Sequence, residues 1–177
     1  MKKNAHININ LKMPSKCMQE LLLIDDYYEL KYSKTSSGHA FRSYTTSCMD
    51  AYNLRNKTTY MRTDSWNKIP ITADWLINNL CDEHNLGMVC LQKLSAGGGV
   101  KWHSHGSYDM SIVHFSLITN PLDLSEVRDD SKIYAKNYPK GDGYIFNSLM
   151  EHRSTNFSEY DRIHLVVECK NEAIHIR

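Results

Sequence analysis

The second half of the chain consists of short strand-like segments, and this pattern constrains the fold more than any other feature. Apolar and β-branched runs are separated by turn signals such as Gly97–Gly99 and Asn120–Pro121. No helical segment alternates with these runs, which excludes a parallel βαβ sheet. The pattern predicts a mainly β protein, an antiparallel barrel or sandwich with helices outside. The predicted strands are 88–94, 100–103, 108–119, 133–135, 144–146, 162–169 and 173–176.

Two helices are predicted before these strands. The first follows Pro14, with Ser15 as a candidate N-cap. The second follows Pro70, with Thr72 as a candidate cap and a glycine stop at 85–87. Residues 33–46 are rich in Ser, Thr and Gly and are interpreted as a loop with short strands. We expect a single domain, 1–177, in which residues 1–87 are rich in helix and loop and residues 88–177 form the β core.

Composition limits the classes of partner. The 177 residues carry 21 Lys and Arg against 20 Asp and Glu, a formal net charge of +1, so no overall field favours nucleic acid. No run of 18 apolar residues is present and the N-terminus lacks the apolar core of a signal peptide. We therefore expect a cytoplasmic protein without a membrane span. Five cysteines without a C-x-x-C pair are interpreted as small apolar residues, and the sequence leaves the oligomeric state open.

Three histidines have the spacing of a metal site. His103 and His105 lie two residues apart on a predicted strand, so their side chains share one face. His152 arrives from a separate strand and can complete a three-imidazole face that leaves other coordination positions open, which suits Fe(II) or a similar ion. The alternative is that these histidines face solvent or satisfy backbone groups in the core.

Arg162 is the second candidate functional residue. Arg162 and His164 share one face of a predicted strand, while Ile163 and the following odd-numbered residues form the other face. A guanidinium inside a small barrel needs an anionic partner, and its fork geometry suits a carboxylate. The alternative is an arginine at the rim, paired with Glu168 or Asp161.

Together these residues resemble the aspartyl/asparaginyl β-hydroxylase family of Fe(II)- and 2-oxoglutarate-dependent dioxygenases. The family pattern has a metal histidine and, eleven residues later, a segment of the type H-I-P-L-x-T-N-P. A glycine, an I/L-F-[DN]-[DN] turn, a second metal histidine, an asparagine and R-x-H-L follow. The matching residues are His103, 114–121 (HFSLITNP), Gly141, 145–148 (IFNS), His152, Asn156 and 162–165 (RIHL). The resemblance covers roughly residues 88 to 169.

The resemblance implies that His103 and His152 bind iron. It implies that Arg162 holds the distal carboxylate of 2-oxoglutarate with His114 nearby, and that the fold is a double-stranded β-helix of the jelly-roll, cupin-like type. The implied reaction couples the oxidative decarboxylation of 2-oxoglutarate to succinate with hydroxylation of an amino acid, a peptide side chain or a related small molecule. His103, His152 and Arg162 are thus the expected catalytic residues, and Arg162 and His114 the expected co-substrate residues.

Two positions depart from the family pattern. His105 stands where many relatives have an aspartate ligand, which leaves the site one negative charge poorer. Ile112 stands where an arginine is common, so the co-substrate site has one cation fewer.

Two other functions fit parts of the sequence. A three-histidine cupin similar to a thiol dioxygenase would use His103, His105 and His152 without 2-oxoglutarate. A non-catalytic barrel would keep Arg162 and His114 to bind an acidic ligand.

Overall fold

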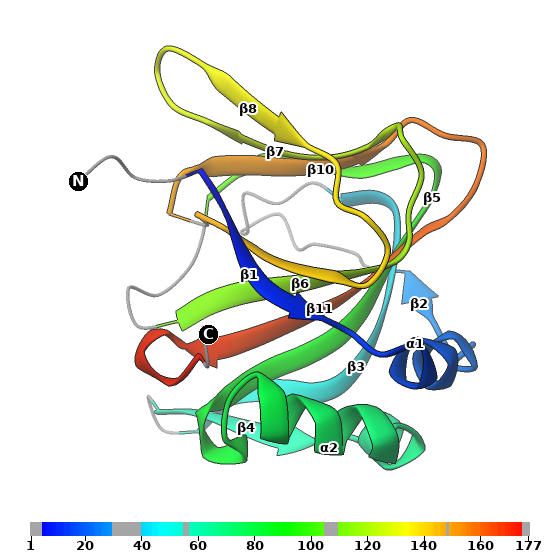
Figure 1. Ribbon diagram of the computed structural model, residues 1–177, viewed down its shortest axis with the longest axis vertical. Coiled ribbons are helices and arrows are strands. Elements are labelled where there is room, and N and C mark those ends of the chain that lie inside the picture. Colours follow the sequence, from blue (N-terminus) through cyan, green and yellow to red (C-terminus); the bar gives the residue numbers. More distant parts are fainter. Residues whose placement is uncertain (1–4, 30–39, 55–56, 105–109, 148, 175–177) are drawn as a thin grey trace.

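In the part of the chain that the structure describes, the fold is one continuous antiparallel sheet of eleven strands that bends into two facing layers, called the two sheets below, with two helices on the outside of one layer (Figure 1). A computed structural model describes residues 5–29, 40–54, 57–104, 110–147 and 149–174. The strands are β1 His6–Lys12, β2 Tyr28–Glu29, β3 Ala40–Leu54, β4 Lys57–Arg62, β5 Leu86–His103, β6 Met110–Ile118, β7 Asp123–Arg128, β8 Ile133–Lys136, β9 Asp142–Phe146, β10 Glu151–Asn156 and β11 Arg162–Lys170. The helices are α1 Ser15–Leu22 and α2 Pro70–Asn79, with 3-10 turns η1 Asp64–Lys68, η2 Glu83–Asn85 and η3 Asn171–Ala173.

The hydrogen-bonded strand order is β1-β9-β6-β11-β5-β10-β7-β8, and β3 joins β5 and carries β2 and β4. One sheet holds β1, β9, β6, β11, β3 and the first half of β5; the other holds β10, β7, β8 and the end of β5. The two sheets enclose the interior in which the candidate site residues lie.

The glycine triplet allows β5 to pass from one sheet to the other. Gly97 has a φ of +67°, which favours glycine. A Cβ on Gly98 would lie 2.6 Å from the Arg42 carbonyl oxygen, and one on Gly99 would lie 2.8 Å from the Ser154 carbonyl oxygen. The triplet therefore does not end the strand, as a turn would. It permits close backbone approach within a continuous strand.

Alternate residues of β6 and β11 face opposite sides of their sheet, as the sequence predicts. The odd-numbered positions join the main hydrophobic core with α1 and α2. The Trp75 ring of α2 meets the Phe115 ring of β6 edge-on, with centroids 5.3 Å apart. The even-numbered positions face the other sheet, which leaves the polar residues of both strands inside the barrel.

Both predicted helices are present, but their caps and end points differ from those that the sequence predicts. Pro14, not Ser15, is the N-cap of α1. The prediction that Thr72 caps α2 is wrong, because the Glu20 carboxylate accepts the N–H groups of Ile71 (3.0 Å) and Thr72 (2.7 Å). The helix ends at Asn79 rather than near residue 85, and the two residues that follow it, Leu80 and Cys81, are fully buried in the core.

The region before residue 87 contains more strand than the sequence predicts. The segment 40–46 belongs to the continuous strand β3. The Thr45 hydroxyl donates to the Leu91 carbonyl (3.0 Å) and the Thr46 hydroxyl to the Asp26 carbonyl (2.9 Å), while the buried Ser43 hydroxyl has no partner among the described residues. The rest of the predicted loop, up to residue 39, lies outside the described residues. The strand predicted at 173–176 is wrong at its start, where η3 ends at Ala173.

All five cysteines are buried and free. Among the residues that the structure describes, no helix has the length and apolarity needed to cross a membrane.

Candidate active site

His103 and His152 form a cross-strand pair between the ends of β5 and β10. They are register partners in the ladder, and their ring centroids are 4.3 Å apart at an interplanar angle of 57°. His152 is buried and His103 is half-buried. Two histidines that are far apart in sequence are thus close enough for both rings to bind one ion.

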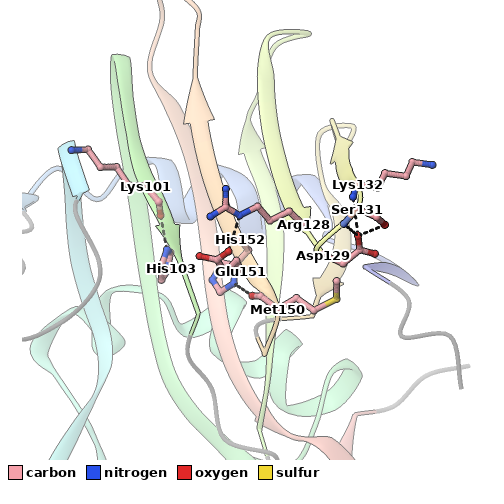
Figure 2. A network of polar contacts seen from close by, with 9 residues as sticks. All are labelled: Lys101, His103, Arg128, Asp129, Ser131, Lys132, Met150, Glu151 and His152. Atoms are coloured by element: carbon pink, nitrogen blue, oxygen red, sulfur yellow. Dashed lines mark hydrogen bonds and ion pairs between the residues drawn. The ribbon is translucent and has the colours of Figure 1, made fainter.

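Backbone carbonyls fix the tautomer of both rings. His103 Nδ1 lies 2.7 Å from the Lys101 carbonyl oxygen, and His152 Nδ1 lies 2.9 Å from the Met150 carbonyl oxygen (Figure 2). A carbonyl only accepts hydrogen bonds, so each Nδ1 carries the proton and the lone pair of a neutral ring is on Nε2. Metal-binding histidines usually show this arrangement, in which the other ring nitrogen donates to a carbonyl or carboxylate.

The third predicted ligand, His105, lies outside the described residues. Within the ranges that the structure describes, no group of three or more His, Cys, Asp or Glu side chains could hold a metal ion. The structure therefore brings together two of the three predicted ligands.

Arg162 is buried between the two sheets, at 3% exposure. Its Nε donates to His164 Nε2 (3.0 Å) on the same strand, and one Nη donates to Ser125 Oγ (3.1 Å) on β7 of the facing sheet. Its other terminal nitrogen, Nη1, is buried and has no hydrogen-bond partner among the described residues.

The alternative of a rim arginine is wrong. Glu168 accepts hydrogen bonds from the Tyr60 hydroxyl and the Met88 N–H, both at 3.3 Å, and Asp161 lies 4.0 Å from the Lys93 ammonium. No carboxylate of the described residues forms an ion pair with Arg162. Buried Asp123 interacts with Arg162 electrostatically but does not pair with it directly. A buried cation without a directly bound anion is unfavourable.

His164 and Tyr144 complete a polar cluster around Arg162. His164 accepts from Arg162 at Nε2, so its proton is on Nδ1, which lies 3.2 Å from the Tyr144 hydroxyl. That hydroxyl is 2.9 Å from Ser125 Oγ. Burial and the positive charge of Arg162 hold the pKa of His164 well below its usual range. The ring is therefore neutral, and Arg162 carries the positive charge of the cluster.

His114 lies in the same cluster, as the resemblance implies. It is buried, its ring stacks on Tyr144 with centroids 5.2 Å apart, and its centroid is 6.1 Å from that of His164. Ile112, which stands where an arginine is common in the family, packs instead in a small apolar cluster with Cys90 and Val166.

The histidine pair and the Arg162 cluster lie at neighbouring levels of the barrel. On β7, Val127 is the register partner of His152, and Ser125, two residues away, contacts Arg162. Two residues along a strand span about 7 Å. Asn156, the asparagine of the family pattern, closes the far end of β10 by donating to the Leu94 and Tyr160 carbonyls.

Sequence reasoning missed Ser125 and Tyr144 as site residues. Ser125 reaches Arg162 from the facing sheet, and Tyr144 joins the cluster from β9 through its contacts with Ser125 and His164, so neither carries a local sequence signal. His164 carried a signal, since it shares a strand face with Arg162.

Comparisons with known proteins identify the family. The model of the aspartyl/asparaginyl beta-hydroxylase family matches residues 12–172, which is most of the chain. The chain belongs to this family. Membership confirms the predicted family and the hydroxylase class of enzyme. A search of curated proteins finds no match.

Solved structures confirm the double-stranded β-helix fold. A carbocyclase from nogalamycin biosynthesis, SnoK, described as non-heme and alpha-ketoglutarate dependent, has a TM-score of 0.61 at 9% identity over 96% of this chain and 81% of its own. A prolyl hydroxylase from Trichoplax adhaerens has a TM-score of 0.59 at 14% identity over 96% and 84% of the two chains. A 2OG-Fe(II) oxygenase family protein from Burkholderia pseudomallei has a TM-score of 0.57 at 12% identity over 77% and 72%.

Proposed function

We propose that this chain hydroxylates an amino acid, a peptide side chain or a related small molecule, using Fe(II) and 2-oxoglutarate. The observation that carries this proposal is the buried guanidinium of Arg162, which has one unpartnered nitrogen and lies about two strand residues from a pair of histidines. A dicarboxylate that binds a metal ion at one end and Arg162 at the other fits this arrangement.

His103 and His152 would hold the iron through Nε2. The carbonyls of Lys101 and Met150 keep the protons on Nδ1, so neither ring has to change tautomer when a metal binds. Neutral imidazole suits Fe(II) among first-row metals. His105 would supply a third imidazole, and this assignment stays a prediction.

Arg162 would hold the distal carboxylate of 2-oxoglutarate. Its Nη1 is the unpartnered donor, while Ser125 and His164 fix the plane of the guanidinium. Charge-assisted hydrogen bonds from a buried guanidinium to a carboxylate are among the strongest in proteins. Because His164 is neutral, the co-substrate carboxylate and Arg162 form a balanced pair of charges.

When bound, Fe(II) supplies the dioxygen chemistry, and 2-oxoglutarate supplies two electrons as it is converted to succinate and carbon dioxide. The contribution of the protein is to bind and orient these groups and to limit the access of water. Buried Val127 and Tyr144 lie beside the site and restrict water on the side of β7 and β9.

The test is release of succinate from 2-oxoglutarate in the presence of Fe(II) and ascorbate, without added substrate. We expect slow turnover by the wild-type protein and none by His152→Ala, while His84→Ala, at an exposed histidine outside the site, keeps the wild-type rate. Absence of succinate from iron-loaded wild-type protein contradicts the proposal. Oxygen consumption with a thiol and without 2-oxoglutarate would favour the cupin alternative.

The role of His105 is tested separately by metal affinity. His105→Ala should weaken Fe(II) binding if its imidazole is a ligand. Unchanged affinity would show that the site is formed without it.

A further inference from the structure

Directly behind the histidine pair, the outer face of the sheet carries one aromatic and four charged side chains, which we call the outer cluster. Its members are Trp102 on β5, Glu151 and Arg153 on β10, and Glu126 and Arg128 on β7. Each of them is next in sequence to His103, to His152 or to Val127, the register partner of His152. Because successive residues of a strand point to opposite faces, the outer cluster lies on the reverse side of the strands that carry the histidines.

The Trp102 ring joins three strands. The guanidinium carbons of Arg128 and Arg153 lie 4.5 and 4.7 Å from the centre of this ring. Since β10 lies between β5 and β7 in the strand order, Arg128 reaches Trp102 across β10, and Figure 2 shows its side chain extending over that strand. Tryptophan is the aromatic residue that attracts a guanidinium most strongly. The end of β5 is therefore attached to β10 through Arg153 and to β7 through Arg128.

Two carboxylates fix the positions of these arginines. Glu126, whose side chain is 7% exposed, accepts hydrogen bonds from Arg153 Nε at 2.5 Å and from Arg153 Nη2 at 2.9 Å. Arg128 Nε donates to Glu151 at 2.7 Å. Both pairs are register partners in the ladder of β7 and β10. Because two parallel hydrogen bonds to one carboxylate fix the plane of a guanidinium, Arg153 is held in place beside the Trp102 ring.

Backbone pairing alone holds the end of β5 weakly. His152 pairs with His103 and Ser154 pairs with Val100, so β5 has one residue more than β10 between these two pairs. Such a β-bulge leaves a residue unpaired and disrupts the ladder locally. His103 is also the last residue of β5, and the ends of elements open most easily. The position of His103 therefore depends on the side-chain contacts of its neighbour Trp102.

We propose that the outer cluster is a positioning device: through Trp102 it holds the end of β5 against β10 and β7, so that the rings of His103 and His152 stay close enough to share one metal ion. As a statement about metal binding, this rests on the proposed function. A site whose ligands are already in place loses less conformational entropy when the ion binds. Groups that orient metal ligands typically contribute roughly 10- to 100-fold to metal affinity.

The first test examines the histidine pair in the metal-free protein. With ring centroids 4.3 Å apart, the ring protons of His103 and His152 should give a nuclear Overhauser effect in a buffer containing EDTA. Trp102→Leu keeps an apolar side chain but removes the ring, and should weaken this effect. Trp102→Tyr should largely keep it, because a tyrosine ring also attracts a guanidinium.

The second test measures Mn(II) affinity from the electron paramagnetic resonance signal of the free ion, without 2-oxoglutarate. We expect Trp102→Leu to bind Mn(II) roughly tenfold more weakly than the wild-type protein, and Trp102→Tyr to bind it nearly as well. Arg128→Met removes one of the two guanidiniums at an exposed ion pair and should weaken binding about threefold. This variant tests the proposal even if Trp102→Leu does not fold.

Two controls separate positioning from stability. Arg62 on β4 also lies over a tryptophan ring, that of Trp66 at 5.3 Å, and also pairs with a glutamate, Glu83. Glu20→Ala removes the acceptor for the first N–H groups of α2 and lowers stability away from the histidines. Arg62→Met and Glu20→Ala should both bind Mn(II) like the wild-type protein under conditions where circular dichroism shows that they are folded.

An unchanged Overhauser effect in folded Trp102→Leu would overturn the proposal, and so would unchanged Mn(II) affinity when the wild-type protein binds the ion. An equal loss of affinity in either control would also overturn it, since lower stability would then explain the result. Equal losses in Trp102→Tyr and Trp102→Leu would exclude the guanidinium contacts as the cause. Wild-type protein that binds no Mn(II) would contradict the proposed function instead, and the Overhauser comparison, made without metal, would still decide the role of the outer cluster.

Discussion

The two faces of strands β6 and β11 have different roles, although they belong to the same stretch of backbone. On one face, Phe115 and Leu165 are fully buried in the main core beneath α1 and α2. On the other, His114, Arg162 and His164 are buried as well, but they form a polar cluster between the sheets. Successive residues of a strand point to opposite faces, so one strand can stabilise the fold and build the site at once.

The two faces should contribute to stability with opposite sign. The helix-facing side removes apolar area from water, which stabilises the fold. The interior side buries a guanidinium that no carboxylate contacts directly, which is unfavourable until an anion binds. Substitutions on each face, measured for both stability and activity, test this difference between the helix-facing side and the interior side.

The largest effect on stability is expected at Phe115. Phe115→Ala should lower the free energy of unfolding by about 3–5 kcal/mol, because it removes a buried ring that packs against Trp75. Urea denaturation followed by circular dichroism measures the change. The control Phe157→Ala, at a side chain with 59% exposure, should change it by less than about 0.5 kcal/mol. Equal losses for both variants would contradict the assignment of the core.

Arg162→Met should have the opposite effect to Phe115→Ala: it should impair activity without lowering stability. The concentration of 2-oxoglutarate needed for half-maximal succinate release should rise roughly 30-fold or more, since loss of one partner of a buried charge pair costs about 2–5 kcal/mol. The free energy of unfolding without ligands should stay the same or increase, because a buried cation is replaced by an apolar chain. Arg62→Met, at an exposed ion pair, serves as the control. A large loss of stability without a change in 2-oxoglutarate dependence would contradict the proposed role.

Stability should fall as pH is lowered through the range below 6.5. The folded protein holds the pKa of His164 well below that of the unfolded chain, so below pH 6.5 the unfolded state binds a proton that the folded state does not. This group should reduce the free energy of unfolding by up to about 1.4 kcal/mol per pH unit. Denaturation at several pH values gives the slope of the unfolding free energy against pH. This slope should be smaller for His164→Gln than for the wild-type protein, and unchanged for His84→Gln. Equal slopes for the wild-type protein and His164→Gln would refute the assignment.

The smallest effect is expected at Glu20, on the helix side. Glu20→Ala removes the acceptor for the N–H groups of Ile71 and Thr72 and should cost about 1 kcal/mol in unfolding free energy. Succinate release at a temperature where the variant is folded should not change. Glu159→Ala, an exposed glutamate outside the core, is the matched control. A change in 2-oxoglutarate dependence of the Glu20 variant would show that the two faces are coupled.

The sequence predicted the alternation on β11 because Arg162 and His164 alternate with the apolar residues Ile163, Leu165 and Val167. It also brought His103 and His152 together through motif order, and the structure places them as ladder partners. The first part of β3 was missed since its buried positions, Ser43, Thr45 and Thr46, are hydroxyl residues and form no apolar pattern.

Long-range contacts account for the other differences. The cap of α2 comes from Glu20, which is 51 residues before Ile71 in the chain. Ser125 contacts Arg162 from the facing sheet, and the residues next to Ser125 in the sequence do not indicate this contact. Such contacts depend on how helices and strands pack together in the folded protein, so they leave no local pattern in the sequence.

The central claim is that one cavity holds a metal ion between His103 and His152 and a 2-oxoglutarate carboxylate on Arg162. Its most direct test is relaxation of the 2-oxoglutarate methylene protons by Mn(II), which suits the same class of site as Fe(II). We predict strong relaxation with the wild-type protein, loss of the effect in His152→Ala, and loss in Arg162→Met at the same concentration of 2-oxoglutarate. Bound Mn(II) and bound 2-oxoglutarate without enhanced relaxation would place them in separate sites and contradict the account.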